Sequence, residues 1–184
     1  MYQKSYKTTP FYNKFNSDIS NIVKSIEQYK KYSENKLSEL EEEYAKQEEN
    51  ASNEEEFLIY LQHHYGPRKI EIYEELNIEL SKTLKQLYTI FEVTLKDLFC
   101  KYDIKNKGIK PMYQPYFEFI KSDLRVEFPP DFENEINELR IKRNEYTHNN
   151  IDMTIPHEEM ERIILDMAKK IQYFFEKIMA IVYN

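Results

Sequence analysis

The stretch Ile70–Phe99, IEIYEELNIELSKTLKQLYTIFEVTLKDLF, decides the fold of this chain. An α-helix has about 3.6 residues per turn, so apolar residues spaced by three and four lie on one face of it. Such spacing runs through the whole stretch, at Ile70, Tyr73, Leu76, Leu80, Leu84, Leu87, Tyr88, Phe91, Leu95, Leu98 and Phe99. At about 1.5 Å per residue the helix spans roughly 45 Å, which is long enough for the central helix of a bundle.

The N-terminal third of the chain contains a second long helical pattern. Its apolar spacing predicts a first helix over Ser17–Ala51, with Ser17 as the N-cap. In the second half of this helix the apolar residues thin out between acidic ones, so we expect that half to protrude or to pack against a partner. Ser52 or Asn53 can cap a short helix over Glu54–His64, and Gly66-Pro67 is expected to interrupt the chain after it.

Three further helices are predicted beyond the central one. A short helix over about Tyr116–Leu124 precedes a helix over Phe132–Thr147, for which Asp131 is the expected N-cap. Thr154 with Pro156 begins the last helix, which carries an unbroken apolar stripe. The predicted fold class is therefore all-α, a helical bundle of four to five main helices with a long N-terminal helix.

Composition supports this fold class. Only two glycines, Gly66 and Gly108, occur in 184 residues, whereas β-sandwiches and barrels use glycine at turn after turn. The length fits a single domain over residues 1–184, with an N-terminal helix and extension over 1–66 and a bundle core over 67–184.

Cysteine content and hydropathy indicate where such a protein works. The single cysteine, Cys100, excludes an internal disulfide and fits a reducing compartment. No apolar run is long enough for a membrane span, and the first residues contain no signal-peptide core. We therefore expect a soluble, cytoplasmic protein without membrane contact.

Charge argues against general nucleic-acid binding, with one local exception. The net charge is −7, whereas proteins that coat nucleic acid are usually basic. Arg140, Lys142 and Arg143 nevertheless form a basic cluster in the helix predicted over Phe132–Thr147. This cluster can select a particular phosphate, with Arg140 and Lys142 as weak RNA-binding residues. It can equally be a solvated helix face that balances the acidic residues earlier in the same helix.

The segment RNEYTH at residues 143–148 combines groups that suit phosphodiester chemistry. Arg143 supplies a planar cation that can hold a phosphate through two nitrogens, and His148 can exchange a proton near pH 7. Asn144 and His148 are spaced i and i+4, so on a helix they share one face. Because RNA carries its own nucleophile, the 2′-hydroxyl, these groups make a candidate cleavage site that needs no metal.

Arg-Asn-x-x-x-His near the end of a helix, in a short all-helical protein, resembles the signature of the HEPN superfamily. The resemblance implies a metal-independent endoribonuclease that leaves a 2′,3′-cyclic phosphate, with Arg143, Asn144 and His148 as catalytic residues and no cofactor. It also implies a homodimer whose paired motifs form one composite site. Glu92, in the preceding helix, matches a glutamate that similar family members often carry. Many members are toxins or antiviral defence effectors, so an antitoxin or another protein partner is expected.

The sequence also departs from that family and leaves other interpretations open. Asn149-Asn150 stands where some HEPN toxins carry a tyrosine that is AMPylated, so that form of control is not supported. A degenerate member could bind only RNA, a nucleotide or a protein, for example through its long N-terminal helix. Arg143 and His148 could also form only a salt bridge at the helix end, where the macrodipole favours a C-terminal histidine.

Competing metal and nucleotide sites are less well supported. Glu145 and His148 have the Glu-x-x-His spacing of di-iron bundles, but His63, His64 and His157 lack a glutamate at the matching position, so no second pair exists. The adjacent His63 and His64 fit a frayed helix end better than a metal site. Two isolated glycines cannot build a phosphate-binding loop. No metal site is predicted.

Overall fold

The computed structural model describes the whole chain apart from residues 1–5, 105–109, 129, 149–155 and 184. The structure describes the backbone but not the side chain at residues 8, 101, 142, 143 and 145–148. Every regular element in the described part is helical, which confirms the all-α prediction. The five main helices are α1 (Pro10–Asn50), α3 (Gly66–Phe99), α4 (Gln114–Ser122), α5 (Phe132–His148) and α6 (His157–Val182).

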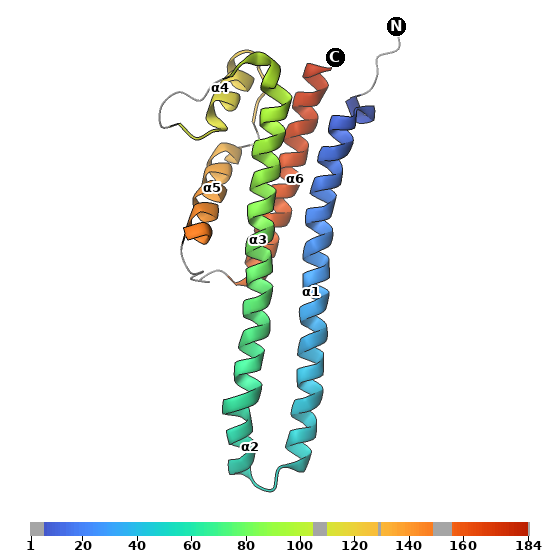
Figure 1. Cartoon of the computed structure of the whole chain (residues 1–184), viewed down its shortest axis with the longest axis vertical. Coiled ribbons are helices and arrows are strands. Elements are labelled where there is room, and N and C mark those ends of the chain that lie inside the picture. The colour runs from blue at the N-terminus through green and yellow to red at the C-terminus, as the bar shows by residue number, and fades with distance from the viewer. Residues whose placement is uncertain (1–5, 105–109, 129, 149–155, 184) are drawn as a thin grey trace.

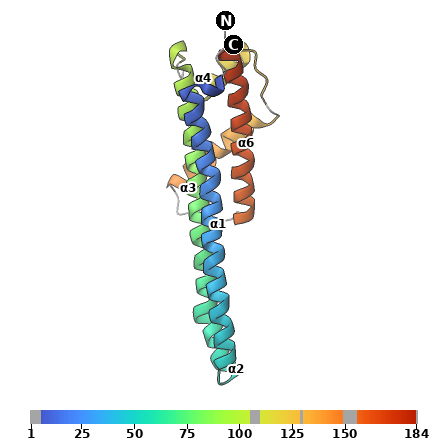
Figure 2. The ribbon, with the colours of Figure 1, turned by 90° about the vertical axis from the view of Figure 1, so that its right-hand side faces the viewer.

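The helices form a bundle from which a two-helix arm projects (Figure 1). α1 and α3 lie antiparallel along their whole length, and α6 packs against both over only one half of it (Figures 1 and 2). α4 and α5 lie on the far side of α3 from α1 (Figure 1). The arm consists of the second half of α1, the short helix α2 (Glu54–Tyr60), and the beginning of α3. The protruding half expected for the first helix is thus paired within the chain.

The first helix begins earlier than the sequence interpretation placed it. Thr9, not Ser17, is the N-cap of α1, because its hydroxyl accepts a hydrogen bond from the amide of Tyr12 at 3.2 Å and Pro10 follows in the first turn. Tyr12 and Phe15 are buried and continue the apolar spacing back from Ile19, which explains why the helix extends there. At the arm tip Asn53 caps α2, as expected, by accepting from the amide of Glu56 at 2.9 Å.

The predicted break at Gly66-Pro67 is wrong, because the helix continues through it. A π-helical turn, η2 (Leu61–Tyr65), joins α2 to α3, and Pro67 lies in the first turn of α3. Proline has no amide hydrogen, so a regular helix here would leave one carbonyl without its donor. In the π turn the amide of Gly66 donates to the carbonyl of Leu61, five residues earlier. Pro67 then lies in the first turn of α3, where an amide hydrogen has no partner within the helix and its absence costs least.

The core of the bundle is a cluster of aromatic rings around Phe91. This side chain is fully buried in α3. Its ring centroid lies within 6.5 Å of the rings of Tyr88, Tyr113, Phe117, Phe132, Phe174 and Phe175. Four helices contribute to this cluster, so it fixes the position of α5 relative to α3 and α6.

Two linkers around α4 position the beginning of α5. A 3-10 turn, η3 (Cys100–Tyr102), ends α3, and α4 begins at Gln114 rather than at Tyr116, because Pro115 fits the first helical turn. Between α4 and α5 the backbone adopts left-handed φ angles of 52° at Arg125 and 63° at Asp131. The predicted capping residue Asp131 accepts a hydrogen bond from the amide of Glu135 through its backbone carbonyl, at 2.9 Å. Thr154, expected to begin the last helix, lies outside the described residues.

Candidate functional site

The motif helix α5 is held to the bundle along one line of apolar side chains and on both flanks. Phe132, Ile136 and Leu139 are buried and face the core. On one flank Glu135 accepts from Lys170 of α6 at 2.5 Å. On the other flank Glu133 pairs with Lys121 of α4. These contacts fix the orientation of α5 about its own axis. The position of a residue along α5 therefore determines which way that residue faces.

The helix continues through His148, so the register of the whole motif follows from its geometry. At about 100° per residue, positions 140, 144 and 148 lie within about 80° of one another and form one face. Leu139 belongs to the line of α5 that faces the bundle, and position 143 lies only about 40° from it around the helix. Position 143 is about 140° from position 148. Asn144 and His148 therefore share a face, as predicted, and the arginine position on that face is 140.

The side chains of the predicted site are only partly described. Asn144 is exposed, whereas the side chains of Lys142, Arg143 and His148 lie outside the described residues. Glu92, the predicted supporting residue, is half-buried on α3. These residues belong to α5 and to the helix packed against it, since α3 and α5 are in contact.

Arg140 is held in place by Asn137 one turn earlier. Its Nε and Nη2 both donate to Asn137 Oδ1, at 3.3 and 3.2 Å, and the hydroxyl of Tyr113 donates to the same oxygen at 3.3 Å. Arg140 is half-buried, which does not match the alternative of a fully solvated helix face at this residue. The spacing of Asn137 and Arg140 could have suggested their contact. Nothing in the sequence could have pointed to Tyr113, which precedes α4.

Tyr113 connects this polar cluster to α3. Burial raises the pKa of its phenol, the nearby Arg140 guanidinium opposes that rise, and the carboxylates of Glu133 and Glu92 add to it. Glu92 is therefore close enough to Tyr113 to affect its ionisation. Tyr113, Asn137 and Arg140 thus link the turn before α4 to α5, and Glu92 of α3 influences this group through Tyr113.

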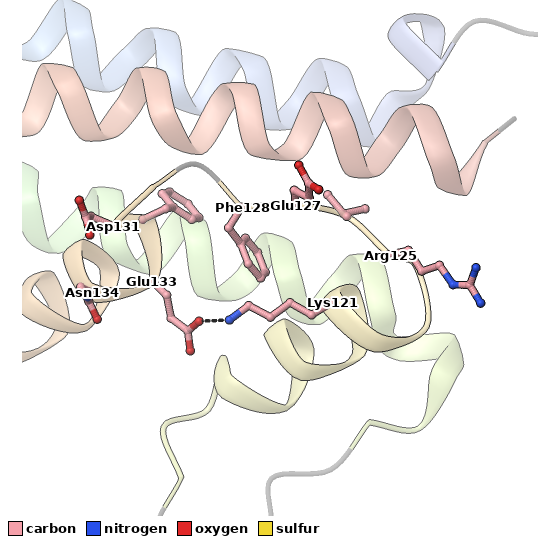
Figure 3. Close-up of a pocket in the computed structure, with 9 residues that line it drawn as sticks. Lys121, Arg125, Glu127, Phe128, Asp131, Glu133 and Asn134 are labelled. Carbon is pink, nitrogen blue, oxygen red and sulfur yellow. Dashed lines mark hydrogen bonds and ion pairs between the residues drawn. The ribbon is translucent and has the colours of Figure 1, made fainter.

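A cavity of about 690 Å³ opens at the other end of α5 (Figure 3). It lies beneath the linker between α4 and α5, at residues 121–134. Lys121 crosses it to pair with Glu133 and also lies 4.9 Å from the ring centroid of Phe128, while Arg125 points away. The principal cation of this cavity is thus already neutralised. The motif begins about ten residues further along α5, roughly 15 Å away, so this cavity is not part of the motif site.

Two other histidines lie in aromatic contacts. The ring of His64, in the π turn, stacks on Tyr60 at 5.9 Å between centroids. His157, at the beginning of α6, stacks on Tyr73 at 5.0 Å. Within the part of the chain that the structure describes, no three His, Cys, Asp or Glu side chains are grouped to hold a metal ion.

The tip of the arm also carries aromatic residues and exposed aliphatic ones. Tyr44 of α1 contacts Phe57 and Tyr65, with centroid distances of 5.4 and 5.0 Å. Leu58 and Ile59, on α2, are about half exposed, at 48% and 53%. This small exposed apolar surface is separate from the motif.

Comparison with known proteins adds no relative. No family model, curated protein or solved structure matches the chain. None of the helices in the described ranges is both long and apolar enough to cross a membrane.

Proposed function

We propose that this protein is a metal-independent endoribonuclease of the HEPN type. The observation that carries the proposal is the geometry of α5, which is helical through the last motif residue. Asn144 and His148 are consequently one turn apart on one face, next to a half-buried arginine. An imidazole, an amide and a guanidinium along one helix can supply the proton transfer and charge stabilisation that cleavage of an RNA phosphodiester needs.

The proposed reaction uses the 2′-hydroxyl of RNA as the nucleophile. The 2′-oxygen forms a bond to phosphorus while the bond from phosphorus to the 5′-oxygen breaks, which leaves a 2′,3′-cyclic phosphate. One imidazole takes the proton of the 2′-hydroxyl, and an acid returns a proton to the departing 5′-oxygen. In this scheme His148 transfers protons, Arg143 stabilises the charge on the phosphate, and Asn144 orients one of these groups.

A dimer makes this chemistry easier. One histidine cannot readily act as base and acid on opposite sides of the same phosphorus, whereas a two-fold dimer supplies two. Positions 143 and 148 of one chain lie about 140° apart around α5, so a single chain does not present both on one face of the helix. In a dimer, Arg143 of one subunit can meet His148 of the other in a shared groove.

The decisive experiment is cleavage of total RNA by the purified protein in EDTA. We expect cleavage to persist in the chelator and to leave 2′,3′-cyclic phosphate ends. His148→Ala should lower the rate by roughly 10²–10⁴-fold, the contribution typical of proton transfer. Activity that EDTA abolishes and Mg²⁺ restores would contradict the proposal, as would full activity in His148→Ala.

The arm favours a second candidate function, a non-catalytic module that binds a protein partner. The specific observation is the exposure of Leu58 and Ile59 next to the aromatic cluster of the arm tip. In this case an RNA-cleavage assay shows no activity, and Leu58→Glu abolishes partner binding. If the first function is correct, the same substitution leaves cleavage unchanged, because the arm tip is remote from α5 (Figure 1).

A further inference from the structure

We propose that Arg140, held by Asn137, binds a second phosphate of the RNA, a few nucleotides from the one that is cleaved. This inference rests on the proposed function and deepens it. It assigns to Arg140 a specific anchoring role in place of the weak, general contribution that composition alone indicates. Asn137 becomes a positioning residue, because it acts on the RNA only through Arg140.

The first support is the neutral acceptor that Arg140 uses within the chain. Its hydrogen-bond acceptor is a neutral amide oxygen, Asn137 Oδ1. By contrast, the two lysines that hold the flanks of α5 are paired with acids, Lys121 with Glu133 and Lys170 with Glu135 and Asp166. Within the described residues no carboxylate forms an ion pair with Arg140, although the chain has 33 acidic and only 26 basic residues. A guanidinium held in this way is suited to bind an anion from outside the chain.

The second support is that Arg140 is preorganised. Two of its nitrogens donate hydrogen bonds to one oxygen, Asn137 Oδ1, and the Tyr113 hydroxyl donates to the same oxygen from the turn before α4. Side-chain entropy that a free arginine would lose on binding has therefore been lost already during folding. Planar guanidinium groups match phosphate oxygens best when their orientation is fixed.

The third support is the position of Arg140 relative to the motif. Positions 140, 144 and 148 follow one another along one face of α5 at intervals of one turn. Positions 140 and 148 are about 12 Å apart along the helix axis. A stacked nucleic-acid strand advances about 3.4 Å per nucleotide, so this distance corresponds to roughly three to four nucleotides. An RNA strand that runs along this face would place one phosphate at His148 and another at Arg140.

The test measures binding separately from cleavage. The probe is a short, labelled single-stranded 2′-O-methyl oligonucleotide, which lacks the nucleophile and so stays intact. Its affinity is measured over a series of salt concentrations for the wild type, Arg140→Gln, Arg140→Lys and Asn137→Ala. Arg162→Gln is the matched control, because it removes one charge from an exposed side chain of α6 (78% accessible).

We expect Arg140→Gln to weaken binding about tenfold and to reduce the slope of log K against log salt by about 0.7, the value for one lost phosphate contact with a single strand. Arg140→Lys keeps the charge, so it should retain the wild-type slope. Asn137→Ala should weaken binding without a change of slope, because the cation remains but is no longer held. Arg162→Gln should match the wild type. This pattern would support the anchoring role even if Arg140→Gln also lowers stability, since Arg140→Lys and Asn137→Ala test charge and position separately.

Two other results would overturn the inference, and they are distinguishable. Wild-type binding that Arg140→Gln leaves unchanged in affinity and slope would refute the role of Arg140 while the proposed function stands. A wild-type protein that neither binds the probe nor cleaves RNA would refute the proposed function and this inference with it.

Discussion

The hydrogen bond between Tyr12 and Glu176 provides a pH-dependent test of how the first and last helices are joined. The Tyr12 hydroxyl of α1 donates to Glu176 Oε1 of α6 at 2.7 Å, and the Tyr12 side chain is only 7% exposed. Burial, together with the hydrogen bond to the Glu176 carboxylate, raises the pKa of Tyr12 to about 12. Tyr12→Phe removes the hydroxyl and keeps the ring.

The expected magnitude follows from this pKa. Relative to the usual pKa near 10, a pKa of about 12 corresponds to about 2.7 kcal/mol between the protonated and ionised forms, to which burial and the hydrogen bond to Glu176 both contribute. A hydrogen bond to a charged group typically contributes about 1.5–3 kcal/mol to stability. Because the folded-state pKa is the higher one, this stabilisation is fully present below pH 10 and is lost as the pH rises through 12. Linkage predicts that about 1.4 kcal/mol of it is lost by pH 11.

Urea unfolding of the wild type and Tyr12→Phe between pH 8 and pH 11 measures the effect, with roughly 2 kcal/mol expected between them at pH 8. The quantity to compare is the difference in unfolding free energy between the two proteins. Other tyrosines with raised pKa values affect both proteins equally and cancel in this difference; they are Tyr29, Tyr60, Tyr113 and Tyr116. That difference should shrink as the pH rises. Tyr173→Phe is the control, since Tyr173 is half exposed on α6. A constant difference from pH 8 to pH 11 would refute the reasoning.

Three further predictions concern the motif and its support. Arg143→Lys keeps the charge but loses the planar fork, so most RNA cleavage should disappear; near-normal rates in a gel assay would reduce Arg143 to a general electrostatic role. Mixing His148→Ala with excess Arg143→Ala subunits should restore partial cleavage, because each mixed dimer keeps one intact Arg143 and one intact His148 on opposite chains; no recovery would favour independent sites or a requirement for both histidines. Phe132→Ala should destabilise the protein by about 3–5 kcal/mol in urea unfolding, since the ring is fully buried among Phe91, Phe117 and Phe174; a loss below about 1 kcal/mol would show that α5 docks by other contacts.

Apolar periodicity was sufficient to predict the helices and their order, and local hydrogen bonding explains the errors at their ends. The spacing that identified Ile19 continues back through Phe15 and Tyr12, so the true beginning of α1 was readable from the same pattern. Gly66-Pro67 was misinterpreted because proline ends most helices, whereas here a π turn precedes it. Such a turn depends on carbonyl pairing, which the spacing of apolar residues does not reveal.

The candidate site was predictable only as far as it lies on one helix. The shared face of Asn144 and His148 follows from their spacing, and α5 has the required helical backbone. That Arg140 shares this face follows from the same spacing, whereas the direction in which the face points depends on the rotation of α5 against the bundle, which Phe132 and its neighbouring rings determine. The contact between Tyr113 and Asn137 joins residues 24 positions apart across a turn. No local pattern encodes a contact of that kind.

The arm has a consequence for the order of folding. The two helical halves of the arm are linked by the three residues 51–53. The hydrogen bond of Tyr65 with Glu41 therefore closes a loop of only 24 residues. The contact of Tyr12 with Glu176 closes 164 residues. Loop-closure entropy makes the longer closure about 1.7 kcal/mol costlier. The hairpin of α1 with α2 and α3 is thus the element that can assemble first, and α6 then completes the bundle against an existing surface.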